Sequence, residues 1–213
     1  MNDNQKFRIR FCLFTIGQLF LVLGTFTIGA RFKVVPSWLS LFFIFSAIGF
    51  VLIYIAFITL YKVNRNYLRS FIAFIIYLII TIFADACSQS KSDFYLIWSR
   101  GLGVSADFLL CIMYVYLFLG TRDYFHERNY IEGRNNSKLG AIILIILFAI
   151  ERTMAFIASL NATKLNYILY SICRFGSWGF QFIINIFIFV VLLIAYIHLR
   201  KQSKEELTNE EKA

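Results

Sequence analysis

The run IILIILFAIERTMAFIASL, residues 142–160, is an apolar stretch with two adjacent charged residues, Glu151 and Arg152, near its middle. It is long enough to cross a bilayer as one helix, since about 20 apolar residues span the hydrocarbon core. A charge at the centre of such a helix costs roughly 2.5–3.5 kcal/mol on insertion scales. Such a residue is therefore usually retained only where another group pairs with it. The pair therefore marks a candidate functional site, and its partners must come from other segments.

The whole chain has the composition of an integral membrane protein. Of its 213 residues 60% are hydrophobic and 15% charged, and the mean hydropathy is +0.71, far from the balance of a soluble domain. We expect an all-α fold, a polytopic membrane helix bundle surrounded by the lipid bilayer. Residues 1–199 are expected to form a single transmembrane domain, followed by a charged cytosolic tail at 200–213. A bacterial inner membrane and a eukaryotic plasma membrane or endomembrane fit the composition equally well.

Six apolar runs are expected to cross the membrane. They cover residues 11–30, 38–61, 71–87, 101–120, 139–160 and 178–199. Residues 121–138 are expected to be the longest polar loop. Residues 166–199 would measure roughly 50 Å as one helix, against about 30 Å of hydrocarbon. We therefore interpret the run from Gly176 to Gly179 as a break in the helix, and residues 166–175 as an interfacial lead-in.

Basic residues predict the orientation of these spans. Six spans with both termini in the cytosol put fourteen of the 21 basic residues on the cytosolic side: Lys6, Arg8, Arg10, Lys62, Arg65, Arg69, Arg122, Arg128, Arg134, Lys138, Arg200, Lys201, Lys204 and Lys212. The opposite side then holds five: Arg31, Lys33, Lys91, Arg100 and Lys164. This asymmetry satisfies the positive-inside rule, so both termini are predicted to be cytosolic.

Five ionisable residues from four segments are expected in the outer half of the membrane. They are Asp85, Asp107, Glu151, Arg152 and Arg174. Neighbours on a helix point about 100° apart, so Glu151 and Arg152 are each expected to find a partner on another helix. We expect Arg152 to pair with Asp107 or Asp85, and Glu151 to pair with Arg174.

Three interpretations of this cluster remain open. The residues could be interhelical ties that fix packing. They could line a polar pocket, open to the outer face, that binds a small ligand. Helix rotation could also separate them, so that no cluster forms. Small residues in the first two spans, Gly17 and Gly49 among them, indicate tight helix packing.

Residue patterns of common catalytic and metal sites are absent from the sequence. The cysteines lie one to a span or span edge, and the two histidines lack metal-ligand spacing, so we expect no metal and no cofactor. Neither an HExxH motif nor a phosphate-binding P-loop occurs. The basic residues form no dense face, which argues against nucleic acid as a partner. We predict no catalytic residues and no enzyme; the enzymatic alternative is a lipid-modifying enzyme with Asp107 or Glu151 as general base.

The expected function is binding. The chain is interpreted as a sensor, receptor or accessory subunit that binds a small molecule or a membrane partner through the outer-half polar cluster. The alternative is a small-solute or ion transporter or channel, which would be a homo-oligomer because six compact spans leave little room for a pore. A polar lining would then continue to the inner side, but the inner halves of the spans are dominated by Ile, Leu and Phe.

Overall fold

In the residues that the structure describes, the protein is a bundle of six long helices. The computed structural model describes residues 3–28, 36–88, 93–161 and 167–210, which are helical throughout except at 61–64 and 128–130. The helices are α1 (Asp3–Ile28), α2 (Pro36–Leu60), α3 (Arg65–Ser88), α4 (Asp93–Glu127), α5 (Ile131–Asn161) and α6 (Tyr167–Glu210). The prediction of an all-α fold with six helices is confirmed.

Four of these helices are long and apolar enough to cross a membrane, as far as the described residues extend. The segments are Arg65–Ala84, Gly101–Glu127, Ile131–Ala158 and Tyr167–Gln202, in α3 to α6. A shorter apolar segment, Ile44–Leu60, lies in α2. Large apolar side chains such as Ile82, Ile146 and Phe156 are exposed on the outside of the bundle. So much exposed apolar surface is typical of helices surrounded by lipid.

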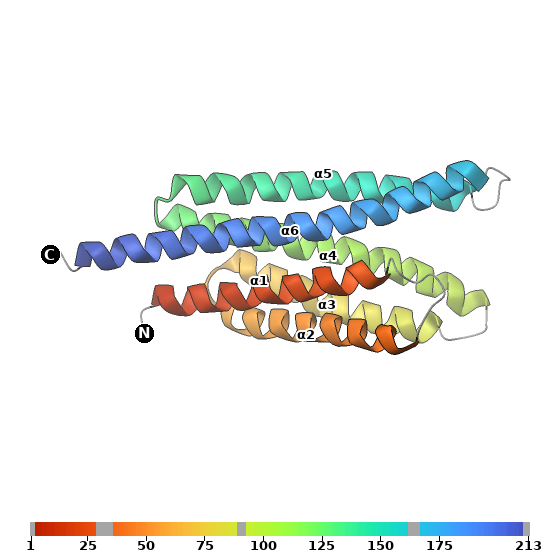
Figure 1. The fold of residues 1–213 in the computed structure, drawn as a ribbon, viewed down its shortest axis with the longest axis horizontal. Coiled ribbons are helices and arrows are strands. Elements are labelled where there is room, and N and C mark those ends of the chain that lie inside the picture. Colours follow the sequence, from red (N-terminus) through yellow and green to blue (C-terminus); the bar gives the residue numbers. More distant parts are fainter. Residues whose placement is uncertain (1–2, 29–35, 89–92, 162–166, 211–213) are drawn as a thin grey trace.

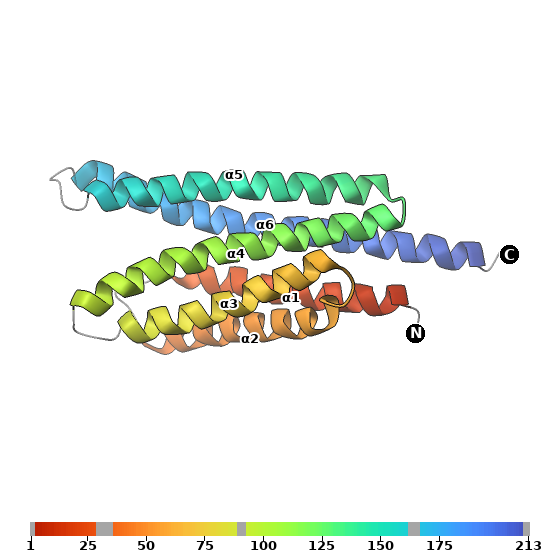
Figure 2. The same ribbon diagram turned by 180° about the vertical axis from the view of Figure 1, so that it is seen from behind.

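Consecutive helices run antiparallel, so the two chain termini lie at the same end of the bundle (Figures 1 and 2). We call this the terminal end and the opposite one the far end. The helices form a ring in chain order, closed by contact between α1 and α6. Packing is extensive between α1 and α2, α3 and α4, and α5 and α6, but sparse between α2 and α3. The bundle is therefore built from three hairpins.

Aromatic side chains fill the bundle core. Phe14 of α1 meets Phe57 of α2 edge to face, with ring centroids 5.0 Å apart, and Phe57 in turn packs on Phe74 of α3 at 5.4 Å. Nearer the terminal end, Phe7 stacks on Tyr124 of α4 at 3.7 Å. Each such ring buries a large apolar area and adds a preferred geometry. We call the fully buried rings of this region the aromatic core: Phe11, Phe14, Phe57, Phe74 and Phe118.

The close approach of α1 and α2 depends on two glycines. A Cβ atom at Gly49 would lie 2.8 Å from the Gly17 carbonyl oxygen, and one at Gly17 would lie 2.9 Å from the Gly49 carbonyl oxygen. Small residues allow helix backbones to come this near inside a membrane. The prediction of tight packing between the first two spans is confirmed at this pair.

The predicted break in the last helix is wrong. α6 is one continuous helix of 44 residues, about 66 Å at 1.5 Å per residue. Gly176 faces α5, where a Cβ atom would meet Cε of Met154, the flexible end of that side chain. Ser177, next to it, is buried against the same helix. These small residues serve helix packing and do not end the helix.

The predicted polar loop at residues 121–138 is also wrong. α4 continues to Glu127 and α5 begins at Ile131. The turn between them is a Schellman motif: Asn129 has a positive φ of 55°, its N–H donates to the His126 carbonyl at 3.0 Å, and the Tyr130 N–H donates to the Phe125 carbonyl at 2.9 Å. Residues 93–100, which lie outside the expected spans, likewise belong to α4.

Candidate functional site

Three helices meet at a partly buried group of charged side chains. Arg152 of α5 donates from Nη1 to Oδ2 of Asp107 on α4 at 2.5 Å. Its Nη2 donates to Oε1 of the neighbouring Glu151 at 2.7 Å, and its Nε donates to Oε2 of the same carboxylate. The Ser177 hydroxyl on α6 donates to Glu151 Oε1 at 2.7 Å. We call Asp107, Glu151, Arg152 and Ser177 the acid–arginine cluster.

Charge in the acid–arginine cluster is not balanced. Glu151 is 2% exposed, whereas the side chains of Arg152 and Asp107 are 21% and 32% exposed. Buried charges are tolerated when they are paired and hydrogen-bonded, and Arg152 pairs with both carboxylates at once. Its guanidinium also lies 5.5 Å from the centroid of the Phe148 ring. Two carboxylates against one guanidinium leave a formal charge of about −1 if all three groups are ionised.

A small cavity of about 40 Å³ lies beside the cluster. Asp107, Glu151 and Arg152 line it together with Tyr114, Gln181 and Asn185, and apolar side chains form most of its wall. About 10–15 Å³ suffices for one water molecule, so the cavity can hold water or an ion. Polar groups from α4, α5 and α6 thus converge on one small space within an apolar bundle.

The polar region continues from the cavity to α1. Tyr114 donates its hydroxyl to Oε1 of Gln18, a side chain with 0% exposure. The amide nitrogen of Gln18 has no hydrogen-bond partner, and it is the only buried side-chain nitrogen or oxygen of this kind in the described part of the chain. Leaving a buried amide unsatisfied costs about 1–3 kcal/mol. Gln18 is therefore a polar group that a bound water or ligand could satisfy.

The structure brings together three of the five predicted site residues. Asp107, Glu151 and Arg152 meet in the cluster, and Arg152 binds Asp107, one of the two partners predicted for it. The predicted pair of Glu151 and Arg174 does not form. Arg174 is exposed, and its guanidinium lies 5.8 Å and 5.3 Å from the ring centroids of Tyr170 and Trp178. Asp85 belongs to α3, but its side chain lies outside the described residues.

Glu151 and Arg152 each have a partner on another helix, Ser177 of α6 and Asp107 of α4, but they also bind each other, which the 100° separation of neighbours did not predict. The Arg152 side chain is long enough to fold back onto its neighbour, and it holds both Glu151 oxygens. Ser177 is not among the predicted site residues, because it falls in the run interpreted as a break. Small residues inside an otherwise apolar helix are the signal that could have identified it as a helix contact.

Metal-binding residues do not gather in this region. Within the described ranges, no group of three or more His, Cys, Asp or Glu side chains is arranged to hold a metal ion. The cysteines Cys12, Cys87, Cys111 and Cys173 are free thiols. Residues with carboxylate, amide and hydroxyl oxygens line the cavity together with Arg152, and oxygen atoms are the donors preferred by hard cations.

The fold and the composition define a helical integral membrane protein with a charged cluster buried between helices. No protein-family model matches the chain, and no curated protein or solved structure matches it.

Proposed function

We propose that this chain is a multi-pass membrane protein that binds a small cation or cationic group at the acid–arginine cluster, and works as a sensor, receptor or accessory subunit. The observation that carries the proposal is the cavity of about 40 Å³ beside an unbalanced pair of carboxylates. Its volume is far below the roughly 300–1,000 Å³ of sites for drug-sized ligands. An ion or a small charged group is the ligand that suits this space.

We further propose six membrane spans with both termini in the cytosol. The common position of the termini at one end of the bundle supports an even number of crossings (Figure 1). Most basic residues of the sequence belong to that end, as the positive-inside rule requires of the cytosolic side. In this orientation Glu151, within the expected span 139–160, lies slightly beyond the middle of the membrane. The cluster would then be reached from the outer side.

Partial exposure of Asp107 supports access to the site. About a third of its side chain is exposed, although it lies within an apolar segment, Gly101–Glu127. A carboxylate at membrane depth is stable only when it faces water, a partner or a counter-ion. The Asp107 side is therefore the route by which a ligand would enter the cavity.

The aromatic core favours binding over passage. Phe14 lies one turn nearer the terminal end than Gln18, where the polar region ends, and its ring packs on Phe57, which packs on Phe74; all three rings are at most 1% exposed. A transporter or channel needs polar groups or water along the whole path. The tightly packed rings make a path through a single chain unfavourable, so the binding role is preferred to the alternative of a transporter.

Cation-dependent stability tests this proposal. Purified protein in nanodiscs is heated in sodium, potassium, ammonium or calcium chloride, with N-methylglucamine chloride keeping the ionic strength constant. A ligand at 100 times its Kd stabilises the folded state by about 2.7 kcal/mol, so we expect one small cation to raise the Tm. Asp107→Asn should abolish this rise because it removes the surplus charge.

A matched control is available at the terminal end. Asp123 also pairs with an arginine, Arg122, at 2.6 Å, but far from the cavity. Asp123→Asn should leave the cation-dependent rise in Tm unchanged. The proposal fails if no cation raises the Tm of the parent protein, or if the rise survives Asp107→Asn.

A further inference from the structure

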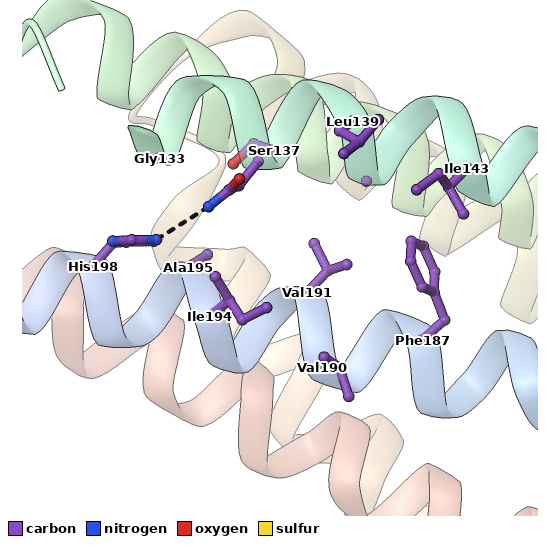
Figure 3. A pocket seen from close by; sticks show the side chains of 12 residues that line it. Gly133, Ser137, Leu139, Ile143, Phe187, Val190, Val191, Ile194, Ala195 and His198 are labelled. Carbon is purple, nitrogen blue, oxygen red and sulfur yellow. Dashed lines mark hydrogen bonds between the residues drawn. The ribbon is translucent and has the colours of Figure 1, made fainter. Parts of the chain in front are cut away.

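A second concave site lies between α5 and α6, near the terminal end. It is a partly open groove of about 220 Å³, much larger than the cavity at the acid–arginine cluster. Figure 3 shows Leu139 and Ile143 of α5 opposite Val191, Ile194 and Phe187 of α6. A water-sized group takes up roughly 30 Å³ in a liquid, so the groove has room for a row of several methylene groups.

One end of the groove is polar. Asn136 Nδ2 lies 3.2 Å from Nε2 of His198, and Nδ1 of the same ring lies 2.8 Å from the Tyr130 hydroxyl. The Tyr130 hydroxyl donates to Glu132 at 3.3 Å. If the Asn136 amide donates to Nε2, the ring proton sits on Nδ1 and points to Tyr130. The bonds to Asn136 and Tyr130 fix the His198 ring, which Figure 3 shows at the end of the groove.

Basic residues surround this polar end. Four exposed cations belong to the same turns of the two helices: Arg134, Lys138, Arg200 and Lys201. The acidic residues nearby in the chain are Glu127, Glu132, Glu205 and Glu206, and the basic ones also include Arg128 and Lys204, so cations outnumber anions in these stretches. Asn136 is exposed, and its amide nitrogen has a second N–H beyond the one directed at His198. This end therefore offers positive charge and hydrogen-bond donors to an anion.

The groove also has the right depth for a lipid. Its apolar walls lie within Ile131–Ala158 and Tyr167–Gln202, the segments of α5 and α6 that can cross a membrane. His198 lies near the terminal ends of both segments, where the headgroup region would be. We propose that this groove binds an acyl chain of an anionic phospholipid, with the phosphate held at the His198 end. Clusters of Lys and Arg beside a membrane span attract anionic lipids in this way. The inference does not depend on what the acid–arginine cluster binds.

Lipid retention tests the groove. The full chain is reconstituted with equal amounts of phosphatidylglycerol and phosphatidylcholine that carry the same acyl chains, then extracted in mild detergent, and its bound lipid is counted by native mass spectrometry. We expect phosphatidylglycerol to be retained about tenfold over phosphatidylcholine, as a few nearby cations would produce. Ile194→Trp should remove the retained lipid because the larger ring fills the groove.

Two further variants make the test specific. Ile146→Trp places the same ring on an exposed position of α5 outside the groove, and it should retain lipid like the parent. A second variant replaces four basic residues together by Gln: Arg134, Lys138, Arg200 and Lys201. It should retain phosphatidylglycerol and phosphatidylcholine in a ratio close to one. This measurement remains informative even if Ile194→Trp does not fold. Equal retention of the two lipids by the parent, or full retention by a folded Ile194→Trp, overturns the proposal. The proposal is also overturned if the parent protein is a dimer and Ile194→Trp dissociates it without changing the amount of bound lipid. The groove is then a contact between two copies of the chain.

Discussion

Arg152 ties two helices together through a single side chain, since its guanidinium binds Asp107 of α4 and Glu151 of α5. Replacing it by leucine leaves two carboxylates without their counter-charge. Breaking a buried ion pair in this way typically costs about 3–5 kcal/mol. We expect Arg152→Leu to lower the free energy of unfolding by about this amount, measured by helical circular dichroism during titration of dodecyl sulfate into mixed micelles.

Arg128 provides the comparison for this variant. Its guanidinium lies 4.1 Å from the centroid of the buried Tyr124 ring at the terminal end, and a cation–π contact of this kind contributes about 0.5–2 kcal/mol. Arg128→Leu should therefore have a much smaller effect than Arg152→Leu. Equal stability of the two variants would show that the acid–arginine cluster contributes little to the fold.

The Gln18 and Tyr114 pair makes a prediction about coupling. Tyr114→Phe removes the hydroxyl and leaves both ends of the buried Gln18 amide unsatisfied, which should cost about 1–3 kcal/mol. Gln18→Leu should cost a similar amount, because it leaves the Tyr114 hydroxyl without its acceptor. The double variant should be nearly as stable as the parent, because neither buried polar group is then left without a hydrogen-bond partner. Additive losses in the same unfolding measurement would contradict this coupling.

The sequence was least successful in predicting which side chains pair with one another. Counting residues along a span gives the depth of Glu151, Asp107 and Arg174, but not the direction in which each side chain points. One residue changes that direction by about 100°, so small errors in helix rotation exchange one partner for another. Arg174 is consequently found on exposed aromatic rings, while Ser177, three residues later, reaches Glu151.

At the scale of helices, the contact of α1 and α2 makes a steric prediction. Gly49→Ala places a methyl group 2.8 Å from the Gly17 carbonyl oxygen, so the helices must move apart. Overpacking of this kind costs about 1–3 kcal/mol. Gly103→Ala is the control, because a Cβ atom there meets nothing within 4 Å. In a helix this control should be neutral or more stable by up to about 1 kcal/mol. A Gly49→Ala protein as stable as Gly103→Ala would rule out a tight glycine contact.

Apolar runs predicted the helices well. A segment in lipid must satisfy all its backbone hydrogen bonds internally, and a helix does this, so an apolar run in a membrane is expected to be helical. They predicted the connections poorly. Polarity marks where a segment leaves lipid, not where its helix ends, so α4 and α5 continue through most of residues 121–138. Only three residues, 128–130, are needed for the turn, because Asn129 adopts the left-handed backbone conformation that the Schellman motif requires.

The whole molecule makes a prediction about sidedness. In a background without native cysteines, single cysteines replace exposed residues at the two ends of the bundle. Those at Lys6, Glu132 and Lys201 should all react with a membrane-impermeant reagent from the cytosolic side, and one at Tyr167 should react from the other side. Opposite labelling of the Lys6→Cys and Lys201→Cys proteins would exclude an even number of spans.

The unbroken length of α6 has a mechanical consequence. From Ser177 to Glu210 the helix has no interruption, which corresponds to about 50 Å at 1.5 Å per residue. Its last turns extend past the other helices at the terminal end (Figure 1). Because the helix has no hinge, a small tilt of α6 about the contact between Ser177 and Glu151 would move the protruding charged segment farther than the contact itself moves.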